Sequence, residues 1–146
     1  MLKGIDRAIT ADVLMVLMSM GHGDDLLICD VNHPAATIAK HTTHGRLVNM
    51  AGCDLPRAAE AILSLMPLDT FVPEPVIRMK VVDDPERTMP IHLRVQDVID
   101  RTEGRAVAIQ ALERFDFYTA AKHAFAVIRT SDPGPYGCFL LRKGVI

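Results

Sequence analysis

Gly21-His22-Gly23-Asp24 leads almost directly into Leu26-Leu27-Ile28-Cys29-Asp30, and the rest of the chain is best understood from this stretch. The apolar run 26–29 is typical of a strand, and it ends at a carboxylate. Because the two glycines give His22 little steric cover and permit unusual backbone angles, we expect its imidazole to stand exposed beside a space that a ligand can enter. The tripeptide Gly21-His22-Gly23 is also compatible with an ordinary turn that exposes its histidine to solvent.

A helix is expected just before this stretch. Thr10 is a suitable N-cap, five apolar residues recur at helical spacing after it, and Gly21 stands just beyond the expected helix end. His22 would then lie near free helix carbonyls and near Asp24 and Asp25, all of which favour a protonated imidazole. A proton donor that works near neutral pH needs such surroundings.

Runs with strand character alternate with helical patterns along the rest of the chain. Strands are predicted at 26–29, 47–50, 76–82, 106–109, 125–128 and 139–141. Further helices are predicted at 54–66, 90–104 and about 115–121. This alternation predicts an α/β fold, in which helices pack on a mostly parallel or mixed sheet in a single layered domain that spans residues 1–146.

Composition narrows the classes of partner. Of the 146 residues, 49% are hydrophobic, which is enough for the chain to bury a core. Because the formal net charge is -2, neither nucleic acid nor an anionic membrane is expected as a partner. The apolar stretch near the N-terminus is too short to span a bilayer, and Asp6 and Asp12 precede it where a signal peptide would have a basic leader. Three widely spaced cysteines fit reduced thiols in a cytoplasmic protein. A small, neutral or mildly polar ligand fits these properties best.

Several polar residues stand at strand ends and in the loops beside them, where ligand sites of α/β folds usually lie. They are Asp30 after the first strand, Asp69 after the helix at 54–66, Arg114 and Tyr118 at the helix of about 115–121, and Tyr136-Gly137-Cys138 before the last strand. Individually, they are also explained as a turn cap, a loop carboxylate, a surface charge or a core aromatic. Together they supply fixed acceptors, a forked donor and an aromatic face, which a sugar site needs.

Four blocks of the chain resemble one known family. They are Met20-Gly21-His22-Gly23-Asp24 with Asp30 and Pro34, Pro67-Leu68-Asp69, Arg114-Phe115 with Phe117-Tyr118, and Tyr136-Gly137 with Leu140-Leu141-Arg142-Lys143-Gly144-Val145. In order and spacing they are similar to the L-fucose mutarotase and D-ribose pyranase family (RbsD/FucU), and the fucose branch is the closer one. The resemblance covers nearly the whole chain.

The resemblance implies an isomerase that interconverts the anomers or ring forms of a monosaccharide such as L-fucose, with no metal or organic cofactor. It gives His22 the role of proton donor and Asp69 a catalytic role. It gives sugar binding to Asp30, Arg114, Tyr136 and Gly137, beside which we expect Tyr118 and Cys138. It also implies a homo-oligomer, commonly a ring-like decamer, whose sites are completed across a subunit boundary.

Two positions depart from the pattern of that family. Cys138 stands where the family's Tyr-Gly-Asn motif has asparagine, so a weakly polar thiol replaces an amide. After the first aspartate the fucose branch usually has Ala-His-Phe-Pro, whereas this chain has Val31-Asn32-His33-Pro34. The histidine is displaced by one position, and in an extended segment it would point the other way.

Mutarotation requires one proton to reach the ring oxygen of the sugar while another leaves the anomeric hydroxyl. As a hypothesis, His22 donates the first proton, Asp30 orients His22 or the sugar, and Asp69 or a tyrosine hydroxyl helps to remove the second. Two other functions stay open. One is a sugar-binding or transport-associated protein without catalysis. The other is a metal-dependent hydrolase built from His22, Asp24, His33, His41 and His44, although no companion motif supports it.

Overall fold

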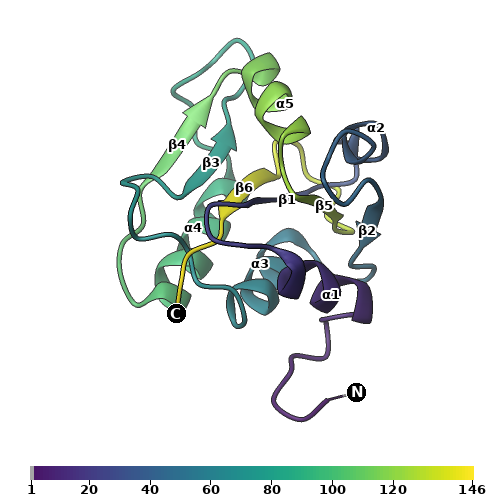
Figure 1. Cartoon of the computed structure of the whole chain (residues 1–146). Coiled ribbons are helices and arrows are strands. Elements are labelled where there is room, and N and C mark those ends of the chain that lie inside the picture. The colour runs from purple at the N-terminus through teal and green to yellow at the C-terminus, as the bar shows by residue number, and fades with distance from the viewer. Residues whose placement is uncertain (1) are drawn as a thin grey trace.

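The computed structural model describes residues 2–146, in which five helices cover both faces of one six-stranded sheet (Figure 1). The helices are α1 (Ala11–Ser19), α2 (Ala35–Ala39), α3 (Leu55–Leu63), α4 (Pro90–Glu103) and α5 (Arg114–Lys122). The strands are β1 (Asp25–Cys29), β2 (Leu47–Asn49), β3 (Val76–Met79), β4 (Ile109–Leu112), β5 (Ala126–Arg129) and β6 (Cys138–Arg142). This architecture confirms the predicted α/β class.

The sheet has the strand order β2-β5-β1-β6-β3-β4. Strand β6 is antiparallel to both of its neighbours, β1 and β3, while β1 with β5, β2 with β5 and β3 with β4 are parallel pairs. Five strands therefore run in one direction and β6 runs in the other. As a result the carboxyl ends of five strands meet the amino end of β6 at one edge of the sheet. We refer to this edge as the carboxyl edge, and to the opposite one as the amino edge.

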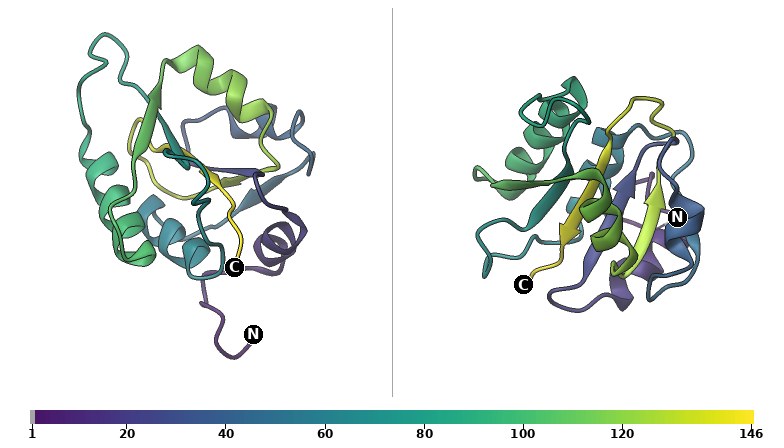
Figure 2. Two further views of the ribbon diagram at one scale, coloured as in Figure 1. Left: turned by 60° about the vertical axis from the view of Figure 1, so that its left-hand side comes forward. Right: turned by 90° about the horizontal axis from the view of Figure 1, so that it is seen from above.

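Successive residues of β1 face opposite layers of helices. Leu26 and Ile28 belong to the core that α1, α3 and α4 cover, whereas Leu27 and Cys29 belong to the core that α2 and α5 cover. Figure 1 shows α1, α3 and α4 below the sheet and α5 above it, and Figure 2 shows the same layers from two other directions. Since both faces are covered, every position from Leu26 to Cys29 is buried, which explains the unbroken apolar run.

Three of the expected helix ends are formed by the residues that the sequence pointed to. Thr10 Oγ1 accepts a hydrogen bond from the backbone N–H of Val13 at 3.2 Å, and Asp54 caps α3 in the same way. Helix α4 ends at Gly104, which has a φ of 66°. Helix α1 ends at Met20 in an extended conformation, one residue earlier than the glycine stop that we expected.

The largest differences from the prediction concern β4 and α2. Strand β4 begins at Ile109, although the apolar run begins at 106, because the backbone of Val107 is bonded to α4 instead of to a strand. Its N–H donates to Asp100 Oδ1 at 2.8 Å, and its carbonyl accepts from Gln96 Nε2 at 2.9 Å. The short helix α2 was not predicted, and Pro34 precedes it without a side-chain cap.

No helix within residues 2–146 combines the length and the apolar character that crossing a bilayer requires. In the same part of the chain, Cys29, Cys53 and Cys138 are buried free thiols. The predicted reduced state of the cysteines therefore agrees with the structure.

Gly144 provides a test of the packing where the chain leaves β6. A Cβ at this position would stand 2.5 Å from the carbonyl oxygen of Leu68 and 2.9 Å from Cα of Asp69, and these backbone atoms cannot rotate away. We expect Gly144→Ala to lower the free energy of unfolding by about 1–3 kcal/mol, measured by urea denaturation. Gly21→Ala is the matched control, because its Cβ would meet only Asp24 Oδ2, at 3.7 Å. Equal losses in the two variants would contradict this explanation.

Candidate functional site

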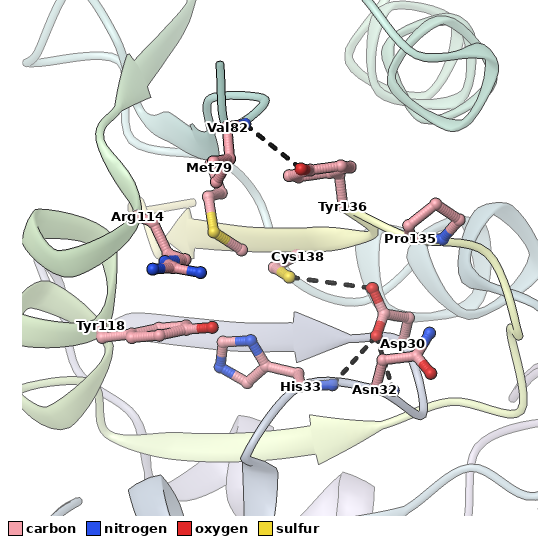
Figure 3. A pocket seen from close by; sticks show the side chains of 10 residues that line it. All are labelled: Asp30, Asn32, His33, Met79, Val82, Arg114, Tyr118, Pro135, Tyr136 and Cys138. Atoms are coloured by element: carbon pink, nitrogen blue, oxygen red, sulfur yellow. Dashed lines mark hydrogen bonds between the residues drawn. The ribbon is translucent and has the colours of Figure 1, made fainter. Parts of the chain in front are cut away.

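A cavity of about 250 Å³ opens at the carboxyl edge of the sheet (Figure 3). This is near the small end of the range for ligand pockets, about 300–1,000 Å³, and suits a small molecule. Its walls come from the ends of β1 and β3, from α5 and from the segment before β6. Ten residues line it: Asp30, Asn32, His33, Met79, Val82, Arg114, Tyr118, Pro135, Tyr136 and Cys138. We refer to this cavity as the carboxyl-edge pocket.

Asp30 forms the fixed floor of the pocket. Its Oδ1 accepts from the backbone N–H of Asn32 at 2.8 Å and of His33 at 3.0 Å, and its Oδ2 accepts from the N–H of Gly137 at 2.8 Å. The residue is only 2% exposed. Burial raises the pKa of Asp30, and the three N–H donors oppose that rise without cancelling it. The carboxyl group is therefore rigid and holds a proton more readily than an ordinary aspartate.

Gly137, just before β6, and Cys138, its first residue, support Asp30. Gly137 does not line the pocket, and its N–H is used by Asp30; an added Cβ would stand 3.3 Å from Asp30 Oδ2. The Sγ atom of Cys138 lies 3.9 Å from the same oxygen. Burial raises the pKa of Cys138 well above its usual range, so the group stays a neutral thiol. Gly137 and Cys138 were both predicted at the sugar site, but of these two residues only Cys138 lines the cavity.

Helix α5 contributes Arg114 and Tyr118 from one face, since they are four residues apart. Buried Phe117 anchors this helix to the core, which fixes the position of both side chains. The guanidinium of Arg114 lies 4.6 Å from the ring centre of the exposed Phe115. Burial raises the pKa of Tyr118, so its hydroxyl remains protonated and can donate as well as accept.

Tyr136 is held in an uncommon backbone conformation beside the pocket. Its φ is 63°, a left-handed value that costs a residue with a Cβ about 1–3 kcal/mol. Its hydroxyl accepts from the N–H of Val82 at 3.2 Å, and its carbonyl lies 3.1 Å from His92 Nε2. Because His92 Nδ1 accepts from the N–H of Met89, Nε2 carries the proton and donates to Tyr136. Burial lowers the pKa of His92 to about 4, which keeps this neutral form in place.

His33 lines the pocket, although it was not among the residues predicted to bind the sugar. It is 6% exposed, and its ring meets Tyr118 edge-on at 5.4 Å. Burial lowers the pKa of His33 to about 4. The segment after β1 is not extended: the Asp30 carboxylate folds it into a turn, and both Asn32 and His33 therefore reach the cavity. A turn after the aspartate that ends a strand is the sequence signal that leads to this position.

His22 and Asp69 form a separate pair at the amino edge. His22 Nε2 lies 3.2 Å from Asp69 Oδ1, and 43% of the His22 side chain is exposed. The N–H of Phe71 and the imidazole of His22 lower the pKa of Asp69, so this carboxyl group is ionised. The carboxylates expected beside His22 have other partners, since Asp24 accepts from the N–H of Gly21 and Asp25 pairs with Arg142.

The pair of His22 and Asp69 is separated from the carboxyl-edge pocket by the full length of β1. His22 precedes this strand and Asp30 follows it, and five strand residues span about 16 Å. Within one chain, His22 therefore does not reach Asp30, which corrects the pairing considered from the sequence. Residues 2–146 also contain no group of three or more His, Cys, Asp or Glu side chains arranged to hold a metal ion, so the five residues considered for a hydrolase are not brought together.

An α/β fold with a small polar pocket at the carboxyl ends of its parallel strands defines a class of small-molecule-binding proteins. Within that class, the chain belongs to the RbsD / FucU transport protein family, whose model matches residues 3–146. This confirms the predicted resemblance.

Three relatives show how close the relationship is. The chain is 37% identical to the fucose mutarotase of Homo sapiens over 148 residues, which cover 99% of this chain and 94% of that protein. The crystal structure of protein Atu2016 matches 100% of this chain and 97% of its own, with a TM-score of 0.97 and 46% identity. The fucose mutarotase of Streptococcus pneumoniae, solved in complex with L-fucose, matches 99% of each chain with a TM-score of 0.88 and 34% identity.

The buried histidines predict how stability depends on pH. Above pH 6.5 both imidazoles are neutral in the folded and in the unfolded chain, whereas between pH 6.5 and about 4 only the unfolded chain gains protons. The free energy of unfolding should therefore fall as the pH falls, by about 2 kcal/mol for each histidine at pH 5. Urea denaturation at pH 7.5, 6 and 5 measures this loss.

The variant His33→Phe should remove about half of the pH-dependent loss, because phenylalanine cannot titrate. Exposed His123 supplies the control, and His123→Gln should keep the full wild-type slope. If His33→Phe follows the wild-type curve across the same range, the assignment of the loss to His33 is wrong.

Proposed function

We propose that the protein is a monosaccharide mutarotase, an isomerase that interconverts the anomers of a sugar such as L-fucose by acid and base catalysis. Membership of the RbsD / FucU family over residues 3–146, with relatives named as fucose mutarotases, is the observation that carries this proposal. The carboxyl-edge pocket adds chemical support. It offers a buried carboxyl acceptor, a forked guanidinium donor and an aromatic wall, which together suit a polyhydroxylated ring.

The reaction consists of proton transfers alone. A proton reaches the ring oxygen while another leaves the anomeric hydroxyl, the bond between the anomeric carbon and the ring oxygen breaks, and an open-chain carbonyl forms. After rotation of that carbonyl, the same steps run in reverse and give the other anomer. Each positioned acid or base contributes typically 10²- to 10⁴-fold, which is about 3–5 kcal/mol of barrier. We propose that Asp30, Arg114 and Tyr118 bind the sugar and that His22 donates the proton to its oxygen.

His22 requires a neighbouring chain to take part, because it lies at the far edge of the sheet from its own pocket. We propose a homo-oligomer in which His22 of one protomer meets the carboxyl-edge pocket of another, in line with the ring-like assembly that the sequence resemblance implies. Exposed apolar side chains support such a contact, since Phe71 lies beside His22 while Val82 and Phe115 adjoin the pocket. Asp69 holds Nε2 of His22 in this arrangement, which leaves Nδ1 for the sugar.

We further propose that residues 1–146 act as one functional unit and work in the cytoplasm. The buried thiols of Cys29, Cys53 and Cys138 fit a reducing compartment.

The role of His22 is tested by His22→Asn. Because this side chain is exposed, the variant should fold normally but lose about 10²- to 10⁴-fold in the rate of anomer exchange. Saturation-transfer NMR with L-fucose, D-ribose and D-galactose measures the exchange and shows which sugar the wild-type protein prefers. Wild-type rates in His22→Asn would refute the assignment. Sugar binding by the wild-type protein without faster exchange would instead identify a binding protein.

The shared site is tested by mixing two inactive variants, His22→Ala and Arg114→Ala. If each site combines His22 of one protomer with Arg114 of another, mixed oligomers contain some sites with both native residues, and activity should reappear. Dissociation and reassociation of the two variants together, followed by the same exchange assay, measures the recovery. The reference for this recovery is a mixture of wild-type protein with a double variant that carries both substitutions in one chain. Lack of recovery in oligomers proven to be mixed would place both residues in the site of one chain and contradict the arrangement.

A further inference from the structure

We propose that His33 contacts the substrate directly, hydrogen-bonds one hydroxyl group of the bound sugar and so determines which sugars the carboxyl-edge pocket accepts. This inference rests on the proposed function in one respect, namely that the pocket binds a sugar. It concerns a residue that the family pattern does not account for, since phenylalanine usually occupies this position in the fucose branch.

The first argument is the unmet hydrogen-bonding capacity of the imidazole. Both ring nitrogens of His33 are buried, and neither has a hydrogen-bond partner within residues 2–146. No other buried side-chain nitrogen or oxygen in this part of the chain lacks a partner. Leaving such a group unpaired costs about 1–3 kcal/mol, so native proteins rarely keep one without a reason. A ligand hydroxyl in the pocket would give one of these nitrogens a partner.

The second argument is the fixed orientation of the ring. The rings of Phe117 and Tyr118 pack against it in T-shaped geometry, with ring centres 6.0 Å and 5.4 Å away and interplanar angles of 90° and 70°. The backbone N–H of His33 donates to Asp30, which holds the residue from the other side. Figure 3 shows the imidazole between Tyr118 and Asp30, facing the interior of the pocket. A side chain held in this way discriminates between ligands because it cannot turn away from a poor one.

The third argument is chemical complementarity. The lining already has an acceptor in Asp30 and a donor in Arg114, but a neutral imidazole offers one N–H donor and one nitrogen acceptor in a single ring. A hydroxyl group both donates and accepts, and it therefore matches either nitrogen. A hydrogen atom or a methyl group in the same place would leave the buried nitrogens unpaired, which is how a polar site rejects a deoxy analogue. A phenylalanine would show no such preference.

The test compares sugars that differ by one hydroxyl: L-galactose with L-fucose, D-galactose with 2-deoxy-D-galactose and with D-fucose, and D-ribose with 2-deoxy-D-ribose. We expect the wild-type protein to favour the hydroxylated member of one pair by at least about 10-fold in kcat/KM for anomer exchange. His33→Phe should reduce that one ratio to near unity and leave the others unchanged. His33→Asn, which keeps a donor and an acceptor, should restore part of it, and His123→Phe should have no effect. A His33→Phe variant that changes every ratio equally, or none, would overturn the proposal.

A binding measurement separates this proposal from the proposed function. The ¹⁵N resonances of the His33 ring, assigned by their loss in His33→Asn, should shift when the preferred sugar of the pairs above is added, because one nitrogen gains a hydrogen bond. If the sugar shifts these resonances but the protein does not accelerate exchange, the mutarotase assignment fails and the contact with His33 stands. If exchange is fast and the ring resonances do not move on saturation with the sugar, the contact with His33 is refuted while the mutarotase assignment stands.

Discussion

The carboxyl-edge pocket depends on one buried carboxyl group. Asp30 ends β1, and its two oxygens need donors because the side chain is shielded from water. Two donors come from its own turn and the third comes from Gly137, whose carbonyl accepts the Asp30 N–H at 2.7 Å in return. This exchange ties the end of β1 to the start of β6. The close approach favours a glycine at 137, where a Cβ would stand 3.3 Å from Asp30 and from Leu55. The turn after β1 carries His33 into the cavity.

The reversed direction of β6 organises the two edges of the sheet. Its first residue, Cys138, lines the pocket, and at its other end the carbonyls of Arg142 and Lys143 accept from the N–H groups of Asp69 and Gly23. One strand therefore supports the pocket at the carboxyl edge and the pair of His22 and Asp69 at the amino edge. Because a packed central strand cannot shorten, no movement within the sheet brings these places together. A site that uses both has to combine two chains.

The sequence predicts those features that local interactions determine. Thr10 and Asp54 begin helices because their side chains bond the nearby backbone, and β1 is apparent because it is apolar at every buried position. Strand β4 is shifted because two side chains of α4, Gln96 and Asp100, take the hydrogen bonds of Val107, and the apolar run at 106–109 does not reveal these partners. The partner of His22 was missed for the same reason, since Asp69 lies 47 residues away. Every residue predicted for the site lies at one edge of the sheet or the other, but only the strand directions reveal which edge.

Three energetically unfavourable features of this molecule lie in the pocket. Tyr136 has a left-handed backbone, the carboxyl group of Asp30 is buried strongly enough to raise its pKa, and the imidazole of His33 lacks a partner in the described chain. At the amino edge, by contrast, Asp24, Asp25 and Asp69 all have donors. Features of this kind persist where the surrounding structure enforces them, and they concentrate at functional sites. An unpaired His33 imidazole lowers the stability of the ligand-free fold. A ligand hydroxyl that bonds His33 removes this cost, and the free energy recovered in this way contributes to the affinity for the ligand.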